Sequence, residues 1–282
     1  MKSNYSVGIV MRTKNRNVLL RRAIQSVLNQ TYKYWHLVIV NDGGNRDELE
    51  YLLSTVPATD KQKITVFHNA ESLGMEAASN IGIKFLDTEL AVIHDDDDSW
   101  APEFLSRMVT VYDVEKHKTA QIGGIVCHSN RVIETTSGNI IQVEKIEPFN
   151  QWIPPGIISL SRMFESNMFV PISFLFELDV CKEIGMFNEK LPVLGDWDFH
   201  IRFLMLRDIW MLPESLAFYH YRLDAGALFG NSVIEGVDKH RKYRLILENE
   251  WIRQDIKNQT IGLGFYVLFM SRVRQLQDHL NK

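Results

Sequence analysis

Four consecutive aspartates, Asp95-Asp96-Asp97-Asp98, follow an apolar run at residues 90–93. Side chains at alternate positions of an extended chain point the same way, so Asp95 and Asp97 can converge on one ligand. Adjacent carboxylates repel one another unless a cation is present, and their hard oxygens suit Mg²⁺ or Mn²⁺ bridged to phosphate. An acidic run can also be a solvated turn that caps the next helix. Its position at the end of an apolar strand favours a functional site.

Two further acidic residues stand at the ends of expected elements. Asp42 follows the apolar run 37–40 and precedes Gly43-Gly44, so its carboxylate could accept hydrogen bonds from a nucleobase that the glycines let approach. Asp-Gly after a strand is also common in ordinary turns. Asp196 lies where a helix begins, which suits either an acid stabilised by the helix dipole or a general base. Spacing alone leaves these two roles of Asp196 open.

The first hundred residues must position these acids, and they alternate apolar runs with segments of helical period. Apolar runs occupy 7–10, 37–40, 64–67 and 90–93, and amphipathic segments occupy 18–28, about 48–53 and about 76–85. This alternation predicts a parallel sheet covered by helices. Sheets of this class bind ligands beyond the carboxyl ends of their strands, where Asp42 and the acidic run fall.

After Pro102, a favourable residue for the first turn of a helix to Tyr112, the alternation loosens. A strand is expected at 122–127, a hairpin at 131–134 with 140–143 around Ser137-Gly138-Asn139, and a strand at 173–176. An amphipathic stretch is expected up to Phe169, and helices at 178–185 and 196–207. We therefore expect the second half of the chain to form a mixed subdomain of helices and strands that packs against the first half.

Composition limits the class of protein. With 282 residues, of which 45% are hydrophobic, the chain can bury a full-sized core. A net charge of -4 offers no basic field for nucleic acid, so no nucleic-acid partner is expected. Cys127 and Cys181 fit no metal-binding spacing and are expected to be buried and reduced. We see no leader-like apolar region after Lys2 and no apolar stretch of about 18 residues, and we expect a cytoplasmic protein.

Taken in order, these motifs resemble the family 2 glycosyltransferases of GT-A fold, over about residues 5–225. The segments that carry the resemblance are 5–16, Asp42, the Gly-to-Asn-x-Gly segment 73–82, the acidic run with Trp100 and Pro102, 185–189 and 195–198. The resemblance implies a Rossmann-like, mostly parallel sheet flanked by helices, with a mixed acceptor-side subdomain. It divides the chain into a nucleotide-sugar-binding half at 1–120, an acceptor-side half of the same domain at 121–230, and a C-terminal helical extension at 231–282.

The same resemblance assigns roles to particular residues. It implies an inverting transfer from a nucleotide diphosphate sugar, UDP favoured, to a hydroxyl of a saccharide or lipid-linked saccharide, as in surface polysaccharide assembly. Asp97 would hold Mn²⁺ or Mg²⁺, and Asp196 would be the base. The residues expected to bind the nucleotide are Thr13, Asn15, Arg16, Asp42, Asp95 and Asp96.

Two departures from the resembled pattern stand out. Ser79 occupies a position where relatives carry Arg, so Arg12, Lys14 or Arg16 is expected to contact phosphate instead. Gly195 occupies a position where relatives often carry Glu.

Several residues carry weaker expectations. His220 would be a metal or phosphate ligand, or else a packed and hydrogen-bonded ring. Arg222 is expected to contact phosphate or acceptor, and Trp197 and Asp198 to contact acceptor, although an aromatic at a helix start is as often core. The tail at 261–282 predicts an amphipathic helix that lies on a membrane at the inner face, on its own domain, or on a second subunit.

Two other functions compete with the glycosyltransferase. A sugar-nucleotide pyrophosphorylase would require a glycine-rich loop after the first strand, and residues 11–16 contain no glycine. A catalytically inactive carbohydrate-binding or scaffold subunit could retain the fold, but the presence of both Asp97 and Asp196 argues against it.

Overall fold

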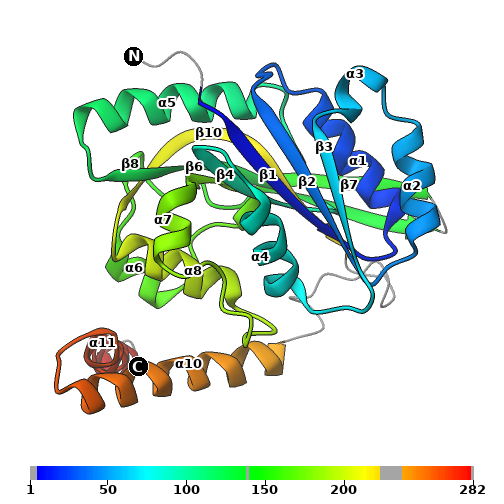
Figure 1. The fold of residues 1–282 in the computed structure, drawn as a ribbon. Helices are drawn as coiled ribbons and strands as arrows, with labels where there is room; N and C mark the ends of the chain where they lie inside the picture. Colours follow the sequence, from blue (N-terminus) through cyan, green and yellow to red (C-terminus); the bar gives the residue numbers. More distant parts are fainter. Residues whose placement is uncertain (1–4, 138–139, 223–236, 281–282) are drawn as a thin grey trace.

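The computed structural model describes residues 5–137, 140–222 and 237–280 (Figure 1). Its centre is a sheet whose strand order is β3-β2-β1-β4-β9-β6-β10-β5, with β7 paired to β6 and β8 paired to β10. The strands are β1 (Val7–Thr13), β2 (Trp35–Asp42), β3 (Ile64–Asn69), β4 (Leu90–Asp95), β5 (Ser99–Trp100), β6 (Ile122–Ser137), β7 (Ile140–Pro148), β8 (Gly156–Ile157), β9 (Phe174–Glu177) and β10 (Asp208–Arg222).

Helices cover both faces of this sheet (Figure 1). They are α1 (Asn17–Leu28), α2 (Arg46–Ser54), α3 (Ala58–Lys61), α4 (Met75–Phe85), α5 (Phe104–Lys118), α6 (Leu160–Glu165), α7 (Leu178–Glu183), α8 (Gly195–Leu204), α10 (Val237–Asn258) and α11 (Leu263–Leu280), with a short 3₁₀ helix at Pro171–Ser173.

The first half of the fold confirms the predicted alternation. β1 pairs in parallel with both β2 and β4, and β2 pairs in parallel with β3. Their registers align Thr13 with Asn41 and Arg12 with Asp95, so β1, β2 and β4 end at one edge of the sheet. Parallel pairing therefore brings Thr13, Asp42 and Asp95 together although they lie far apart in the sequence.

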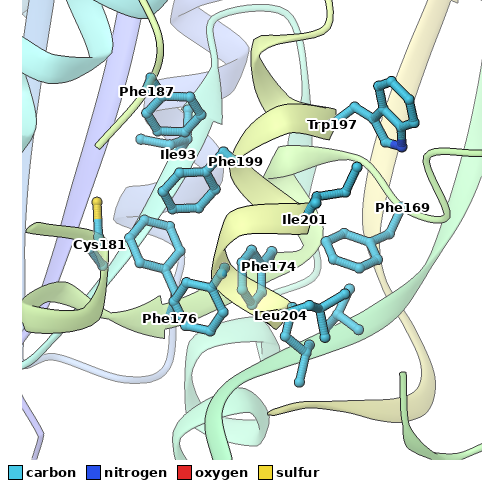
Figure 2. Close-up of a cluster of buried hydrophobic side chains, with 14 of the residues drawn as sticks. Ile93, Phe169, Phe174, Phe176, Cys181, Phe187, Trp197, Phe199, Ile201 and Leu204 are labelled. Carbon is cyan, nitrogen blue, oxygen red and sulfur yellow. The ribbon is translucent and has the colours of Figure 1, made fainter. Parts of the chain in front are cut away.

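Alternate side chains of the parallel strands enter two separate cores. Ile9, Met11 and Val92 pack with α1, α2 and α5 on one face. Val10 and Ile93 pack with α4, α7 and α8 on the other, where Phe174, Phe176, Phe187, Phe199 and Phe203 form an aromatic cluster (Figure 2). The strands are apolar at successive positions because both faces are buried.

The second half differs from the prediction in its longest element. The expected strand at 122–127 and the first hairpin strand at 131–134 are one continuous strand, β6. Polar residues at 128–130 broke the apolar pattern, but the buried His128 ring contacts the backbone oxygen of Ile153 through Nε2 at 2.9 Å, and the Ser129 N–H donates to Asn150 Oδ1 at 2.7 Å. Such partners let polar residues continue inside a sheet. Gly138 and Asn139 of the expected turn lie outside the described residues.

Other boundaries shift by a few residues. α5 begins at Phe104, so Pro102 lies before the helix and not in its first turn. The amphipathic stretch before Phe169 is helical only over α6. Cys127 and Cys181 are buried, as expected. The predicted boundary between 230 and 231 lies outside the described residues.

The C-terminal extension is a pair of helices, α10 and α11, that docks against α6 and α8. Trp251 of α10 contacts the rings of Phe164 and Trp197, and Tyr266 of α11 also contacts Phe164. One face of the pair thus packs on its own domain, which the sequence left as one of three possibilities. No described helix is long and apolar enough to cross a bilayer.

Candidate active site

A cavity of about 790 Å³ lies at the carboxyl ends of β1, β2 and β4. The N-terminal turns of α4 and α8 and residues of β10 complete its wall. Eleven of the residues singled out in the sequence line this cavity, namely Arg12, Thr13, Lys14, Asn15, Arg16, Asp42, Asp95, Asp96, Asp97, Asp98 and Asp196. Segments separated by more than 150 positions in the sequence therefore meet in one place.

The four aspartates of the acidic run have different partners. Arg12 donates to Asp95 Oδ1 from Nε at 3.0 Å and from Nη2 at 2.8 Å. Asp96 accepts a hydrogen bond of 2.7 Å from Thr13 Oγ1 and one of 3.1 Å from Arg16 Nη1. Its pKa is raised to about 6 because burial and the neighbouring Asp97 charge outweigh these donors.

Asp97 and Asp98 connect the acidic run to β10. Asp97 Oδ2 accepts hydrogen bonds from Arg222 Nη2 and, at 3.4 Å, from Arg16 Nη1. Asp98 is buried, and its Oδ1 accepts the backbone N–H of His220 at 2.8 Å. Burial and the charges of Asp97 and Asp95 raise the pKa of Asp98. Asp98 is therefore a structural residue of the turn.

Glu134 on β6 is the centre of a buried ion network beneath the acidic run. It accepts hydrogen bonds from Arg22 of α1 and, at 3.1 Å, from Arg222 Nη1. It also forms a hydrogen bond of 2.7 Å with His220 Nδ1. Burial alone would raise its pKa, but hydrogen bonds and charges from His220 and Arg22 lower it to about 2. Arg22 also donates to the backbone oxygen of Asp97 at 2.6 Å. The ion network thus fixes the turn that carries Asp95 to Asp98 through contacts from α1, β6 and β10.

Asp42 holds the loop between β3 and α4. It accepts hydrogen bonds from the backbone N–H groups of Leu73 and Gly74, at 2.8 and 3.0 Å, and from the side chains of Asn69 and Ser72. Burial would raise the pKa of Asp42, but these four donors lower it overall. Gly43, with a φ of 75°, is packed against the backbone of residues 71–72. This glycine lets the backbone of residues 71–72 approach closely.

Asp196 lies in the first turn of α8, directly after Leu194, whose φ of 66° is left-handed, and Gly195. Its Oδ1 accepts the N–H of Trp197 at 2.8 Å, and its Oδ2 accepts Nδ2 of Asn167 at 2.7 Å. Burial raises the pKa of Asp196, although these donors oppose the shift. A raised pKa makes a carboxylate a stronger proton acceptor.

Arg12 lies beside Ser79, the position at which relatives carry Arg. Its Nη1 donates to Ser79 Oγ at 2.9 Å and to the backbone oxygen of Met75 at 3.3 Å. The guanidinium lines the cavity between the acidic run and α4. Arg12 of β1 thus places a cation beside position 79 of α4.

Four of the weaker assignments fall outside the cavity wall. Trp197 is 2% exposed and donates to the backbone oxygen of Met163, so it belongs to the core and is not an acceptor platform (Figure 2). Asp198 is buried against Arg202 of its own helix. These positions correct the expectation of acceptor contacts.

Arg222 and His220 are also internal. Arg222 is fully buried and binds Asp97 and Glu134, which corrects the expected direct contact with phosphate or acceptor. Both ring nitrogens of His220 are engaged, Nδ1 with Glu134 and Nε2 with Ser99 Oγ at 2.8 Å. Burial lowers the pKa of His220. The geometry favours the packed, hydrogen-bonded alternative over a metal ligand.

The residues present fit a cation held largely by its bound phosphates. Among the residues described, no three His, Cys, Asp or Glu side chains form a metal cage. Asp97 lines the cavity, and in the described part of the chain no donor contacts its Oδ1. Mg²⁺ is commonly bound by one or two carboxylates together with substrate phosphates and waters. Asp97 therefore suits this mode, with Asp95 beside it.

Sequence reasoning missed Glu134, Arg22 and Glu76. Glu134 and Arg22 read as ordinary surface charges of a hairpin and an amphipathic helix, and only their contact across 112 residues reveals their role. Glu76 carried one signal, because it is an acid two residues after Gly74, in the first turn of a helix next to the cavity.

A mixed sheet with a parallel first half and a carboxylate-lined cavity at the ends of those parallel strands characterises an α/β protein of the GT-A type. The chain belongs to glycosyl transferase family 2, whose pattern matches residues 8–185.

Named relatives agree with this family. WcaA of Escherichia coli (strain K12), whose name links it to colanic acid biosynthesis, is 40% identical over 106 residues, which are 38% of this chain and 37% of that protein. Staphylococcus aureus TarS 1-349, solved in complex with UDP-GlcNAc, has a TM-score of 0.60 at 16% identity, over 78% of this chain and 60% of that one.

The mannosyltransferase PcManGT of Pyrobaculum calidifontis, solved with GDP-Man and Mn²⁺, has a TM-score of 0.55 at 14% identity, over 77% of this chain and 57% of that one. At these identities the solved structures establish the GT-A fold. The chain spans less than two thirds of the length of each of these three proteins.

We predict that Glu134→Gln destabilises the fold by about 3–5 kcal/mol, because it removes the buried counter-charge that Arg22 and Arg222 share and leaves Arg222 with Asp97 alone. The folded-state pKa lies below the ordinary value of 4.5, so the contribution is complete above about pH 4.5 and is lost as the pH falls toward 2. Urea unfolding at pH 7 and at pH 3 measures both effects. Glu144→Gln, on the exposed face of the same hairpin, should change stability by less than about 0.5 kcal/mol.

Proposed function

We propose that this protein is an inverting glycosyltransferase that moves a sugar from a nucleotide diphosphate donor to a saccharide hydroxyl. The observation that carries the proposal is the placement of Asp97 and Asp196 on one cavity wall, from the turn after β4 and the start of α8. The first suits the diphosphate end of a donor, and the second suits the attacking hydroxyl. Membership of glycosyl transferase family 2 supports the same reaction.

The nucleotide would bind beyond β1 and β2. Thr13, Asn15 and Arg16 line that side of the cavity together with Asp42 and Asp96. The ordered loop that Asp42 holds gives the base a rigid wall of backbone. Uridine is favoured by the resemblance, and TarS provides one relative in fold that was solved with UDP-GlcNAc.

Arg12, Arg16 and Lys14 line the cavity near the acidic run and would contact the donor's phosphates. A cation on Asp97, Mn²⁺ or Mg²⁺, would offset negative charge on the departing diphosphate. Arg222 would act indirectly, by holding Asp97 in position through the buried ion network.

Asp196 would accept the proton of the acceptor hydroxyl as its oxygen attacks the anomeric carbon. The bond between that carbon and the diphosphate oxygen breaks, and its electron pair leaves with the nucleoside diphosphate. Attack from the face opposite the diphosphate inverts the anomeric centre. Asn167 orients the carboxylate through its hydrogen bond to Oδ2.

Replacing the base tests this assignment directly. Asp196→Asn should lower kcat by about 10²- to 10⁴-fold, because proton removal is lost, while donor affinity changes little. Asp179→Asn, at the exposed first turn of α7, is the matched control and should retain full activity. If Asp196→Asn keeps more than about a tenth of the wild-type rate, the base is another residue.

Donor and metal can be identified together by thermal shift with UDP, GDP, dTDP and CDP sugars. One class of donor should raise Tm in the presence of Mn²⁺, because ligand binding stabilises the folded state by mass action, and EDTA or Asp97→Ala should abolish the shift. The same donor should release nucleoside diphosphate only with metal. Absence of release across the panel would favour an inactive scaffold, and formation of nucleoside triphosphate when pyrophosphate is added to the nucleotide sugar would favour a pyrophosphorylase.

We further propose that α11 rests on an anionic membrane that carries a lipid-linked acceptor. Phe265, Leu268, Phe269, Arg272 and Leu276 recur at helical spacing, and the four apolar members are each more than half exposed. The opposite stripe, with Tyr266, packs on the domain. An exposed apolar stripe with a cation is typical of helices that lie at a membrane surface.

Vesicle binding tests the membrane contact. The triple variant Phe265→Ser, Leu268→Ser, Phe269→Ser should lose co-sedimentation with phosphatidylglycerol vesicles while the wild-type protein sediments with them. The control replaces three exposed apolar residues of β7, Ile140, Val143 and Ile146, by serine and should still bind. The proposal would be overturned if the wild-type protein does not bind vesicles and instead dimerises through α11, as measured by light scattering.

A further inference from the structure

Glu76 occupies space that exists only because residue 195 is glycine. It lies in the first turn of α4, and its side chain lies against Gly195, the residue before Asp196. A Cβ atom built on Gly195 would lie 2.2 Å from Glu76 Oε1, 2.5 Å from its Cγ and 2.6 Å from its Cδ. Any larger residue at position 195 would displace this carboxyl group.

The Glu76 carboxyl group is buried without a side-chain partner. The residue is 6% exposed, and in the described part of the chain no side chain donates a hydrogen bond to it. Its own backbone N–H is the donor that lowers its pKa, while burial, the largest effect, raises that pKa to about 7 against the opposing charge of Arg12. Burying a carboxyl group costs free energy, and a ligand that donates a further hydrogen bond would offset part of that cost.

Glu76 also lies near groups at both ends of the proposed reaction. It lines the same cavity as Asp95 and Asp196, and both charges act on it. Arg12, which holds Asp95, also acts on the Glu76 charge. Because Glu76 lies against the residue before Asp196, a sugar bound beside Asp196 in this cavity would meet the Glu76 carboxyl group.

We propose that Glu76 is a positioning residue that accepts a hydrogen bond from a saccharide hydroxyl beside the reacting centre. This inference rests on the proposed function and adds a sugar-binding group to it. The hydroxyl belongs either to the donor sugar or to the acceptor, since both meet at Asp196. The chemistry is the same in the two cases, and kinetics distinguish them.

Two substitutions test the contact. Glu76→Ala should lower kcat/KM for transfer by about 10- to 100-fold, the range expected for losing a hydrogen bond to a charged group. Glu76→Gln retains an acceptor oxygen and should lose less. If the donor sugar is held, KM for donor rises and acceptor-free donor hydrolysis falls equally. If the acceptor is held, hydrolysis stays at the wild-type rate and transfer alone falls.

Moving the carboxyl group across the gap gives a stricter test. Glu76→Ala removes the Cγ, Cδ and Oε1 atoms that block residue 195, and Gly195 does not have the positive φ that favours glycine. The double variant Glu76→Ala, Gly195→Glu should regain at least several-fold of the lost activity. Its matched control, Glu76→Ala, Gly195→Gln, fills the same space without a carboxylate and should remain about as slow as Glu76→Ala.

The outcomes separate this inference from the proposed function. A wild-type protein that neither transfers nor hydrolyses any sugar nucleotide overturns the glycosyltransferase itself. A wild-type protein that is active, with Glu76→Ala equally active and equally stable by thermal unfolding, overturns the role of Glu76 alone. Equal activity of the two double variants, both folded, has the same consequence, because carboxylate chemistry would then be irrelevant.

Discussion

The buried contact of Arg222 with both Asp97 and Glu134 holds the cavity together. Four aspartates at the end of a strand would repel one another, and the turn between β4 and β5 can exist only if cations are fixed beside it. Arg222 is fully buried and reaches Asp97 and Glu134 from β10, while Arg22 reaches the same glutamate and the backbone of Asp97 from α1. The ion network thus fixes the geometry of the turn before any ligand arrives.

Carboxylates in this cavity divide between holding protein and facing ligand. Asp42 and Asp98 accept backbone N–H groups and thereby shape the walls. Glu76 and Asp196 line the same cavity from the first turns of α4 and α8, and burial raises the pKa of each. The division follows from what surrounds each group, because one residue type serves both purposes.

The sequence predicted the parallel half of the fold because strands buried on both faces give uninterrupted apolar runs between amphipathic helices. It did not predict that β6 runs unbroken through residues 128–130, since the partners of Ser129 and His128 lie in the distant loop 149–155. The sequence also identified Asp42 and the acidic run, because each directly follows an apolar run that forms a strand, β2 or β4. Glu134 and Glu76 gain their significance from contacts with residues about 90 to 120 positions away, which no local pattern encodes.

β10 lies far along the chain from the acidic turn that it neutralises, so the two meet only late in synthesis. Asp97 lies in the first hundred residues, whereas its buried counter-charge, Arg222, ends a strand that pairs with β6. A nascent chain that has emerged only as far as β4 and α5 carries the acidic turn without its cation. The parallel half can begin to assemble during synthesis, but the turn is neutralised only after β10 has left the ribosome and joined the sheet. Completion of the cavity is therefore a late event in biogenesis, coupled to long-range strand pairing.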